Sequence, residues 1–275
     1  MHQQAVNKKI CISYRNLNKA APIVKLVTKS CSQIYDLPED SLFNYYPLLI
    51  WIETLVYEAD EQVEAAQAQG RALSQVSPWN FQKEIIESLF KELNLEHPTI
   101  QKALNRVSEF FDLESQLLAA GATVTHLDVI RAGELRPCDF QLLHCTLIQL
   151  AGKSYRAEVF DLLSCREILL EIVDDVLSYK KDIAVGQYNT YWMFERLYGE
   201  KAPDYLQAEA ERYRHLFQER LKQFSTDEQK FYSELWSRFE QRNALIFNAD
   251  LIRASALKGE EVNELNAIAL ADQVH

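Results

Sequence analysis

The chain has 275 residues and a formal net charge of −11 at pH 7, with 48% hydrophobic and 25% charged residues. This composition is typical of a globular protein, and its acidic balance argues against binding to nucleic acid or to an anionic membrane surface. Only 7 Gly and 7 Pro are present, and such a shortage of turn-forming residues argues against an all-β fold. The cysteines form no C-x-x-C pair and the histidines no i, i+4 pair, which disfavours a zinc knuckle, a full disulfide framework or a histidine-built metal site.

Apolar residues recur at helical spacing along nearly the whole chain, which predicts an all-α protein. No apolar run reaches the roughly 20 residues of a bilayer span, and residues 1–10 are too polar for a signal peptide. We therefore expect a cytoplasmic protein without a transmembrane segment. No long linker separates the predicted helices, so we expect a single domain over 1–275, with a polar tail at 258–275 that frays. The predicted helices cover 17–35, 41–69, 78–93, 98–120, 124–133, 138–152, 155–186, 188–198, 203–223 and 226–256.

The predicted helix 41–69 carries an acidic face inside an otherwise apolar sequence. Asp60 and Glu64 are four residues apart, so their side chains lie on one face, one turn apart, and their repulsion requires a compensating cation. Tyr57 points into the same sector, and Glu53 lies on the same face two turns earlier. Taken alone, this pattern also fits a solvated helix face with Lys partners elsewhere.

The predicted helix 155–186 carries a second acidic face. Asp174, Ser178 and Asp182 follow an i, i+4, i+8 spacing, which places their oxygen atoms along about 12 Å of one helix face. The rest of this helix is apolar nearly all round, as in a buried central helix, where three such groups would be costly to bury without a cation. Such a set of hard oxygen ligands suits Mg²⁺. Glu167 and Glu171 lie near the centre of the same face.

Two motifs resemble those of class I terpene synthases of the bacterial and fungal type. The second metal motif of that family reads (N/D)DxxSxx(K/R)(E/D), and residues 174–182 satisfy each of its positions, with Gly186 and Asn189 following as in the family. Residues 60–64 resemble the first, aspartate-rich motif, with Glu at its second and last acidic places. The resemblance covers about 45–255. It implies a single-domain antiparallel helical bundle of the class I terpenoid synthase type, with a central cavity between the two acidic helices.

The resemblance also implies roles for individual residues. His126 to Gly133 resembles the stretch that holds the diphosphate-sensing arginine, and Arg131 is preferred over Arg136 for that role. Arg253 resembles the arginine of the C-terminal pattern, for which Arg238 competes. Three Mg²⁺ ions would bind together with the diphosphate, and Tyr57 would stabilise the carbocation through its ring. The implied metal ligands are Asp60, Glu61, Glu64, Asp174, Ser178 and Asp182, and the implied diphosphate contacts are Arg131, Lys181 and Arg253.

The implied reaction is the Mg²⁺-dependent ionisation of an isoprenyl diphosphate, farnesyl diphosphate being favoured, with release of diphosphate and formation of a terpene hydrocarbon or alcohol. Glu53 and Glu171 would reach the cavity, where each either quenches the cation or forms a salt bridge without a chemical role. The alternatives are a prenyltransferase of related fold and an inactive helical scaffold that retains the fold. The sequence does not decide between a monomer and a homodimer.

Overall fold

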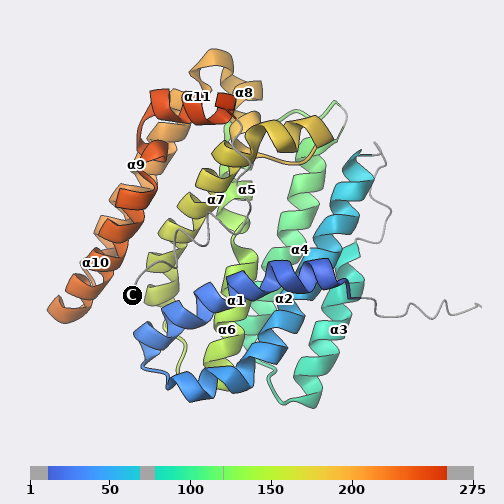
Figure 1. The fold of residues 1–275 in the computed structure, drawn as a ribbon, viewed down its shortest axis with the longest axis vertical. Helices are drawn as coiled ribbons and strands as arrows, with labels where there is room; N and C mark the ends of the chain where they lie inside the picture. The colour runs from blue at the N-terminus through green and yellow to red at the C-terminus, as the bar shows by residue number, and fades with distance from the viewer. Residues whose placement is uncertain (1–11, 69–77, 120, 259–275) are drawn as a thin grey trace, which may run out of the picture.

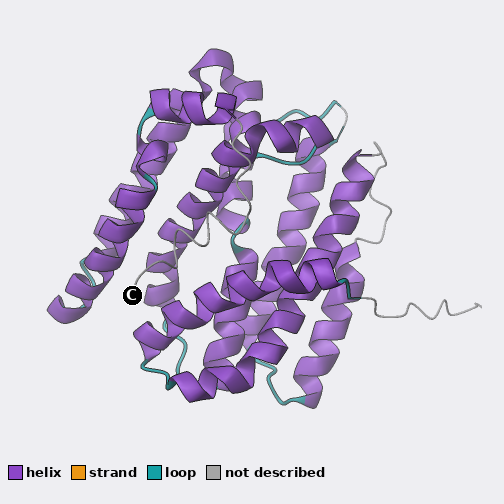
Figure 2. Ribbon diagram, viewed as in Figure 1, coloured by secondary structure: helices purple, strands orange, loops and turns teal. Residues whose placement is uncertain are grey.

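The computed structural model describes residues 12–68, 78–119 and 121–258, and within these ranges all regular secondary structure is helical, without strands (Figure 2). None of the described helices is both long enough and apolar enough to cross a membrane. The tail that was predicted to fray, 258–275, lies outside the described residues except for Lys258. The last residues predicted for helices 41–69 and 98–120 also lie outside them. The elements are α1 (Tyr14–Tyr35), α2 (Glu39–Ala68), α3 (Pro78–Glu92), α4 (Pro98–Leu118), α5 (His126–Leu135), α6 (Cys138–Leu150), α7 (Ala157–Val185), α8 (Thr190–Tyr198), η1 (Gly199–Lys201), α9 (Ala202–Leu221), α10 (Thr226–Arg242), η2 (Ala244–Phe247) and α11 (Ala249–Lys258).

Local caps determine where several helices begin and end. A capping box at Thr125 and Asp128 starts α5, two residues later than its apolar pattern predicts, because the two side chains satisfy backbone N–H groups that the first turn leaves open. Gly186 ends α7 with a φ of 77°. This left-handed conformation is accessible to glycine at little cost. The helix then gives way to the segment that leads into α8.

The prediction of one helix over 226–256 is wrong, because the structure divides this segment into α10, η2 and α11. Asn243 ends α10, and its Nδ2 donates to the Phe239 carbonyl at 3.0 Å. Asn248 begins α11, since its Oδ1 accepts from the backbone N–H groups of Asp250 and Leu251 at 3.0 and 3.1 Å. Both asparagines favour helix ends over helix interiors. The apolar periodicity continues through them and so conceals the break.

Two clusters of buried apolar residues form the core. One is built mainly from α1, α2, α3, α4 and α6, and the other mainly from α5 and from α7 through α11. Figure 1 shows α1 crossing over α2 and α6, and α9 running beside α7. Full burial of a Leu or Ile, such as Ile52 on α2 or Leu169 on α7, contributes about 1.5–3 kcal/mol. The buried faces of α2 and α7 therefore hold their polar faces in fixed positions.

Candidate functional site

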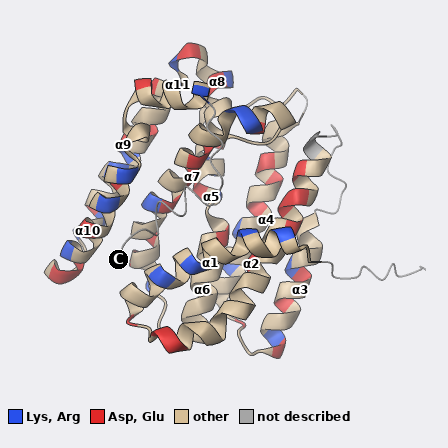
Figure 3. Ribbon diagram, in the orientation of Figure 1, with Lys and Arg blue, Asp and Glu red and all other residues tan. Residues whose placement is uncertain are grey.

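A pocket of about 300 Å³ lies between side chains of α1, α2, α4, α6 and α7. Part of its wall is apolar, with Val56, Val107, Phe110, Phe111 and Val173. Figure 3 shows acidic positions on α2, α4 and α7, and basic positions along α1. The carboxyl groups outnumber the basic groups in the lining, so the pocket has a negative charge to be compensated. The acidic lining residues are Asp60, Glu64, Glu114, Asp139, Glu171, Asp174 and Asp182, and the basic ones are Arg15, Lys19, Arg136 and Lys181.

The α2 wall brings Asp60, Glu64 and Tyr57 into this pocket. Burial raises the pKa of Asp60 well above its usual value, and the adjacent Glu64 carboxylate raises it further. The Lys19 ammonium lies 5.4 Å from the centre of the Tyr57 ring, so that aromatic face is near the charged groups and already attracts a cation. Glu61 does not line this pocket and instead lies 3.5 Å from the Arg15 guanidinium.

The α7 wall brings Asp174, Ser178, Lys181 and Asp182 into the same pocket. Ser178 Oγ donates to Asp182 Oδ2 at 2.5 Å, which aligns the two oxygen ligands along the helix. Burial, followed by the Glu171 carboxylate, raises the pKa of Asp174 to about 7. Both acidic helix faces predicted from the sequence therefore meet in one pocket. The charge of Asp174 is costly there until a cation compensates it.

The loop after α7 holds the motif in place through Asn189, which is fully buried. Asn189 Nδ2 donates to the Asp175 carbonyl at 2.7 Å and to Asp182 Oδ2 at 3.0 Å. Its Oδ1 accepts from the Trp192 N–H at 3.1 Å and so caps α8. Asp175, also fully buried, accepts from the Thr190 N–H at 2.9 Å. The second Asp of the motif thus anchors α8, whereas the first lines the pocket.

The structure places Arg131 away from the pocket and Arg136 in its wall. Arg131 has a side chain 43% exposed and forms an ion pair with Glu109 at 2.5 Å. Arg136, at the C-cap of α5, is 18% exposed; its Nε contacts Glu171 at 2.7 Å and its Nη2 contacts Asp175 at 2.9 Å. Burial opposes its charge, but the Asp175 and Glu171 carboxylates raise the pKa of Arg136 well above its usual value. Of these two arginines, Arg136 is therefore the one available to an anion in this pocket.

Of the C-terminal residues, an asparagine lines the pocket and the two candidate arginines do not. Arg253 has a half-exposed side chain that donates to the Glu200 carbonyl at 3.2 Å and lies 3.7 Å from Asp250. Neither it nor its competitor Arg238, which is exposed, belongs to the pocket lining among the described residues. Asn243 does line the pocket. Its position follows from the helix break that the periodicity conceals.

Three further carboxyls lie in or beside the pocket. Glu171 lines the pocket and is neutralised by Arg136. Glu53 is 0% exposed and does not line the pocket, and burial together with the Asp139 carboxyl raises its pKa. Asp139 lines the pocket, and burial and the Glu171 carboxylate raise its pKa to about 7. Sequence reasoning missed Asp139 because an Asp in a first helical turn is an ordinary start signal.

The donor set fits Mg²⁺ shared with an anionic ligand better than a closed metal site. Among the described residues, no three His, Cys, Asp or Glu side chains are grouped so that they could hold a metal ion by themselves. The oxygen ligands instead come from two walls, with Asp60 and Glu64 on one and the Asp174, Ser178 and Asp182 group on the other. Mg²⁺ commonly binds one or two carboxylates and completes its octahedron with water and substrate phosphates.

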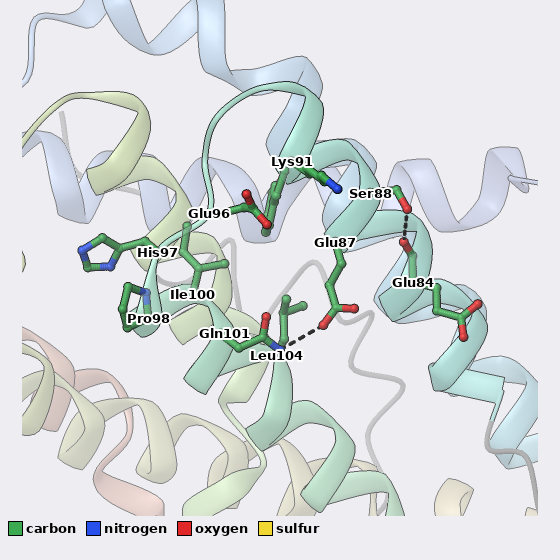
Figure 4. A pocket seen from close by; sticks show the side chains of 11 residues that line it. Glu84, Glu87, Ser88, Lys91, Glu96, His97, Pro98, Ile100, Gln101 and Leu104 are labelled. Atoms are coloured by element: carbon green, nitrogen blue, oxygen red, sulfur yellow. Dashed lines mark hydrogen bonds between the residues drawn. The ribbon is translucent and has the colours of Figure 1, made fainter.

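A second pocket, of about 730 Å³, lies between α3 and α4 and contains none of the predicted site residues (Figure 4). Two contacts join residues of its lining: Gln101 Nε2 donates to Glu87 at 2.9 Å, and Ser88 Oγ donates to the Glu84 backbone carbonyl at 2.8 Å. Its lining contains the carboxyls of Glu84, Glu87 and Glu96, fewer than the seven of the first pocket.

Comparisons of the chain with protein-family models, curated proteins and solved structures found no significant match. A function for the chain accordingly has to come from the residues of the first pocket and from the motifs at 60–64 and 174–182. Six residues of the two motifs line that pocket, namely Asp60, Glu64, Asp174, Ser178, Lys181 and Asp182.

Proposed function

We propose that this chain is a Mg²⁺-dependent enzyme that ionises an isoprenyl diphosphate and releases diphosphate and a terpene product, as class I terpene synthases do. The observation that carries the proposal is that Asp60 and Glu64 on α2 line the same pocket as Asp174, Ser178 and Asp182 on α7. Either face alone is a common pattern. Their meeting in one partly apolar pocket, beside Arg136 and Lys181, matches what a diphosphate with an apolar tail requires.

The charged side chains would bind and orient the diphosphate. Mg²⁺, held by the acidic groups of α2 and α7 together with the diphosphate, would supply Lewis-acid stabilisation of the leaving group. Arg136 holds Glu171 and Asp175 through Nε and Nη2, and its Nη1 takes part in neither contact and can donate to a phosphate oxygen. Lys181 lies on the same wall and would add a second positive charge. In this assignment Arg136 takes the role expected for Arg131, and Arg253 has none.

The apolar side chains would hold the hydrocarbon part and exclude water. Phe110 and Phe111 on α4 and Val56 on α2 line the pocket next to Tyr57. Aromatic faces attract a positive carbon, and a dry pocket delays its capture by water. A volume of about 300 Å³ lies at the lower end of the range for ligand pockets. It favours a chain such as farnesyl over longer polyprenyl chains.

The test is incubation of the purified protein with geranyl, farnesyl or geranylgeranyl diphosphate, with and without Mg²⁺. Released diphosphate and organic products are measured separately, the latter by gas chromatography with mass detection. We expect Mg²⁺-dependent release, reduced about 100-fold or more in Ser178→Ala because the ligand lies at the reacting centre. Ser164→Ala is the matched control, since Ser164 is on α7 and donates to the Asp161 carbonyl outside the pocket.

Three outcomes separate the proposal from its alternatives. Release that depends on Mg²⁺ and Ser178 supports the ionisation mechanism. Release that requires an added prenyl acceptor would indicate a prenyltransferase of related fold. A folded, helical wild-type protein that releases no diphosphate from any of the three substrates would contradict the proposal and favour an inactive scaffold.

A further inference from the structure

The acidic groups in and beside the pocket form two sets along the helices: an outer set at Asp60 and Asp174, and an inner set at Glu53 and Glu171. On α2, Glu53 precedes Asp60 by seven residues, which is about 10 Å along the helix. On α7, Glu171 precedes Asp174 by three residues, which is about 4.5 Å in the same chain direction. Asp139, whose pKa is raised by Glu171 after burial, belongs to this inner set. A diphosphate bound at the outer set would place its hydrocarbon part nearer to the inner set.

Glu53 and Asp139 are neighbouring buried carboxyls, and the Asp139 carboxyl adds to the effect of burial in raising the pKa of Glu53. Glu53 is 0% exposed, and neither of its carboxylate oxygens has a hydrogen-bond partner that meets geometric criteria among the described residues. The charged groups that most affect Glu53 are Asp139, Asp60 and Glu171, which are all acidic. A buried carboxyl among like charges retains its proton. Glu53 is therefore the neutral member of the pair.

Asp139 carries the negative charge of the pair. Its Oδ1 accepts from the Phe140 N–H at 2.7 Å, and it lies in the first turn of α6, where backbone N–H groups favour an anion. Asp139 forms no ion pair with a Lys, Arg or His in the described part of the chain, whereas the neighbouring Glu171 is held by Arg136 at 2.7 Å. Asp139 is thus a wall carboxylate without a cationic partner, and its second oxygen, Oδ2, is not used by the Phe140 contact.

We propose that Asp139 is the base that ends the reaction, by removing a proton from the carbocation, and that Glu53 is a positioning residue behind it. The inference rests on the proposed function. A C–H bond next to the cationic carbon breaks, its electron pair forms the C=C bond of the product, and the proton moves to Asp139 Oδ2. Asp139 then gives this proton to water when the product leaves. The product is an alkene, and no further reactant is needed.

The structure also favours Asp139 over Glu171 as the base. The Glu171 carboxylate is engaged by the Arg136 guanidinium, with Nε donating to Oε2 at 2.7 Å. Protonation of Asp139 would remove an unpaired negative charge from a buried wall, whereas protonation of Glu171 would leave Arg136 with one partner fewer. The position of Asp139 in the pocket wall allows direct contact with the hydrocarbon chain, which Glu53 lacks.

The experiment compares Asp139→Asn with Asp204→Asn in the full-length protein with farnesyl diphosphate and Mg²⁺. Asp204 is exposed, lies in the first turn of α9, and does not line the pocket, so it controls for the loss of an acid at a helix start. Diphosphate release and the product mixture are measured in the same reaction. We expect Asp139→Asn to retain release but to lose about tenfold or more of the wild-type alkene, in favour of alcohols or other isomers.

The role of Glu53 is tested by two variants that differ in polarity. Glu53→Gln keeps a neutral polar group of the same size beside Asp139, so we expect the wild-type product mixture. Glu53→Leu replaces it with an apolar group, and we expect its mixture to shift toward that of Asp139→Asn. If Glu53→Gln alone reproduces the Asp139→Asn mixture, Glu53 would be the base and the assignment would be overturned.

The outcomes distinguish this inference from the proposed function. Unchanged products in Asp139→Asn, with wild-type release of diphosphate, would overturn the inference and leave the proposed function standing. Absence of diphosphate release from the folded wild type would overturn both. A changed mixture in Asp204→Asn would also contradict the assignment, because that variant leaves the pocket intact.

Discussion

Replacement of Asp174 by Asn is expected to stabilise the ligand-free protein while removing its Mg²⁺-dependent activity. Burial and Glu171 raise the pKa of Asp174 from 3.8 to about 7 in the folded state. A carboxyl whose pKa is higher in the folded state makes the protein most stable below the unfolded pKa. The free energy of unfolding then falls as the pH rises from the unfolded pKa to the folded pKa. An uncharged Asn does not incur this loss. The wild type should therefore be the less stable protein above neutral pH.

The magnitude follows from the two pKa values. The ionisation of Asp174 costs about 1 kcal/mol of unfolding free energy near pH 4.5 and about 4 kcal/mol near pH 8. The second value corresponds to a rise in Tm of roughly 8–16 °C for Asp174→Asn. Denaturant titration followed by far-ultraviolet circular dichroism at both pH values measures the difference. Asp161→Asn, exposed on the same helix, should change stability by less than about 0.5 kcal/mol.

Two results would refute the reasoning. Asp174→Asn could be less stable than the wild type at the higher pH, which would mean that the carboxylate is well compensated without a ligand. Alternatively, the stability difference could be the same at both pH values. In that case the effect of the substitution would come from packing or hydrogen bonding and not from ionisation.

Two further substitutions test the supports of the site. Arg136→Met should lower the free energy of unfolding by about 3–5 kcal/mol because Glu171 and Asp175 lose a buried partner. Arg131→Met, at an exposed pair, should lower it by less than about 1 kcal/mol. Equal effects of the two substitutions in denaturant titrations would contradict the placement of the two arginines. Asn189→Ala should cost about 2–4 kcal/mol in the same assay, since it removes the cap of α8 and the buried side-chain donor to the Asp175 carbonyl and to Asp182 Oδ2. A loss below about 0.5 kcal/mol would show that water replaces the amide.

Apolar periodicity predicted the helical class and the approximate span of most helices, because a helix in a protein gains most of its stability from burying one apolar face. It could not locate ends that depend on caps. The break between α10 and α11 at Asn243 and Asn248 is an example, since the apolar residues Leu245 and Ile246 continue the pattern through the turn. A rule that gives more weight to paired asparagines would have divided this segment.

The residues of the site were likewise predictable only in part from the sequence. Spacing within one helix placed Asp174, Ser178 and Asp182 together because helical geometry fixes which residues share a face. Spacing between helices gives no such constraint. Arg131 and Arg136 are five residues apart and face different surroundings, and only the packing of α5 beside α7 determines which of them reaches the pocket. Asp139 was missed because its place in the first turn of α6 is that of an ordinary helix-start signal.

The two adjacent aspartates of α7 explain why its acidic face is tolerated. Asp175 is fully buried, but its carboxylate is bound by Arg136 at 2.9 Å and by the Thr190 N–H at 2.9 Å, so the protein itself offsets part of the cost of this burial. Asp174, one residue earlier, lines the pocket and has no comparable set of donors among the described residues. A fold that needed neither charge would place apolar residues at both positions. The second carboxylate therefore secures the structure, whereas the first is the one that the proposed cation would compensate.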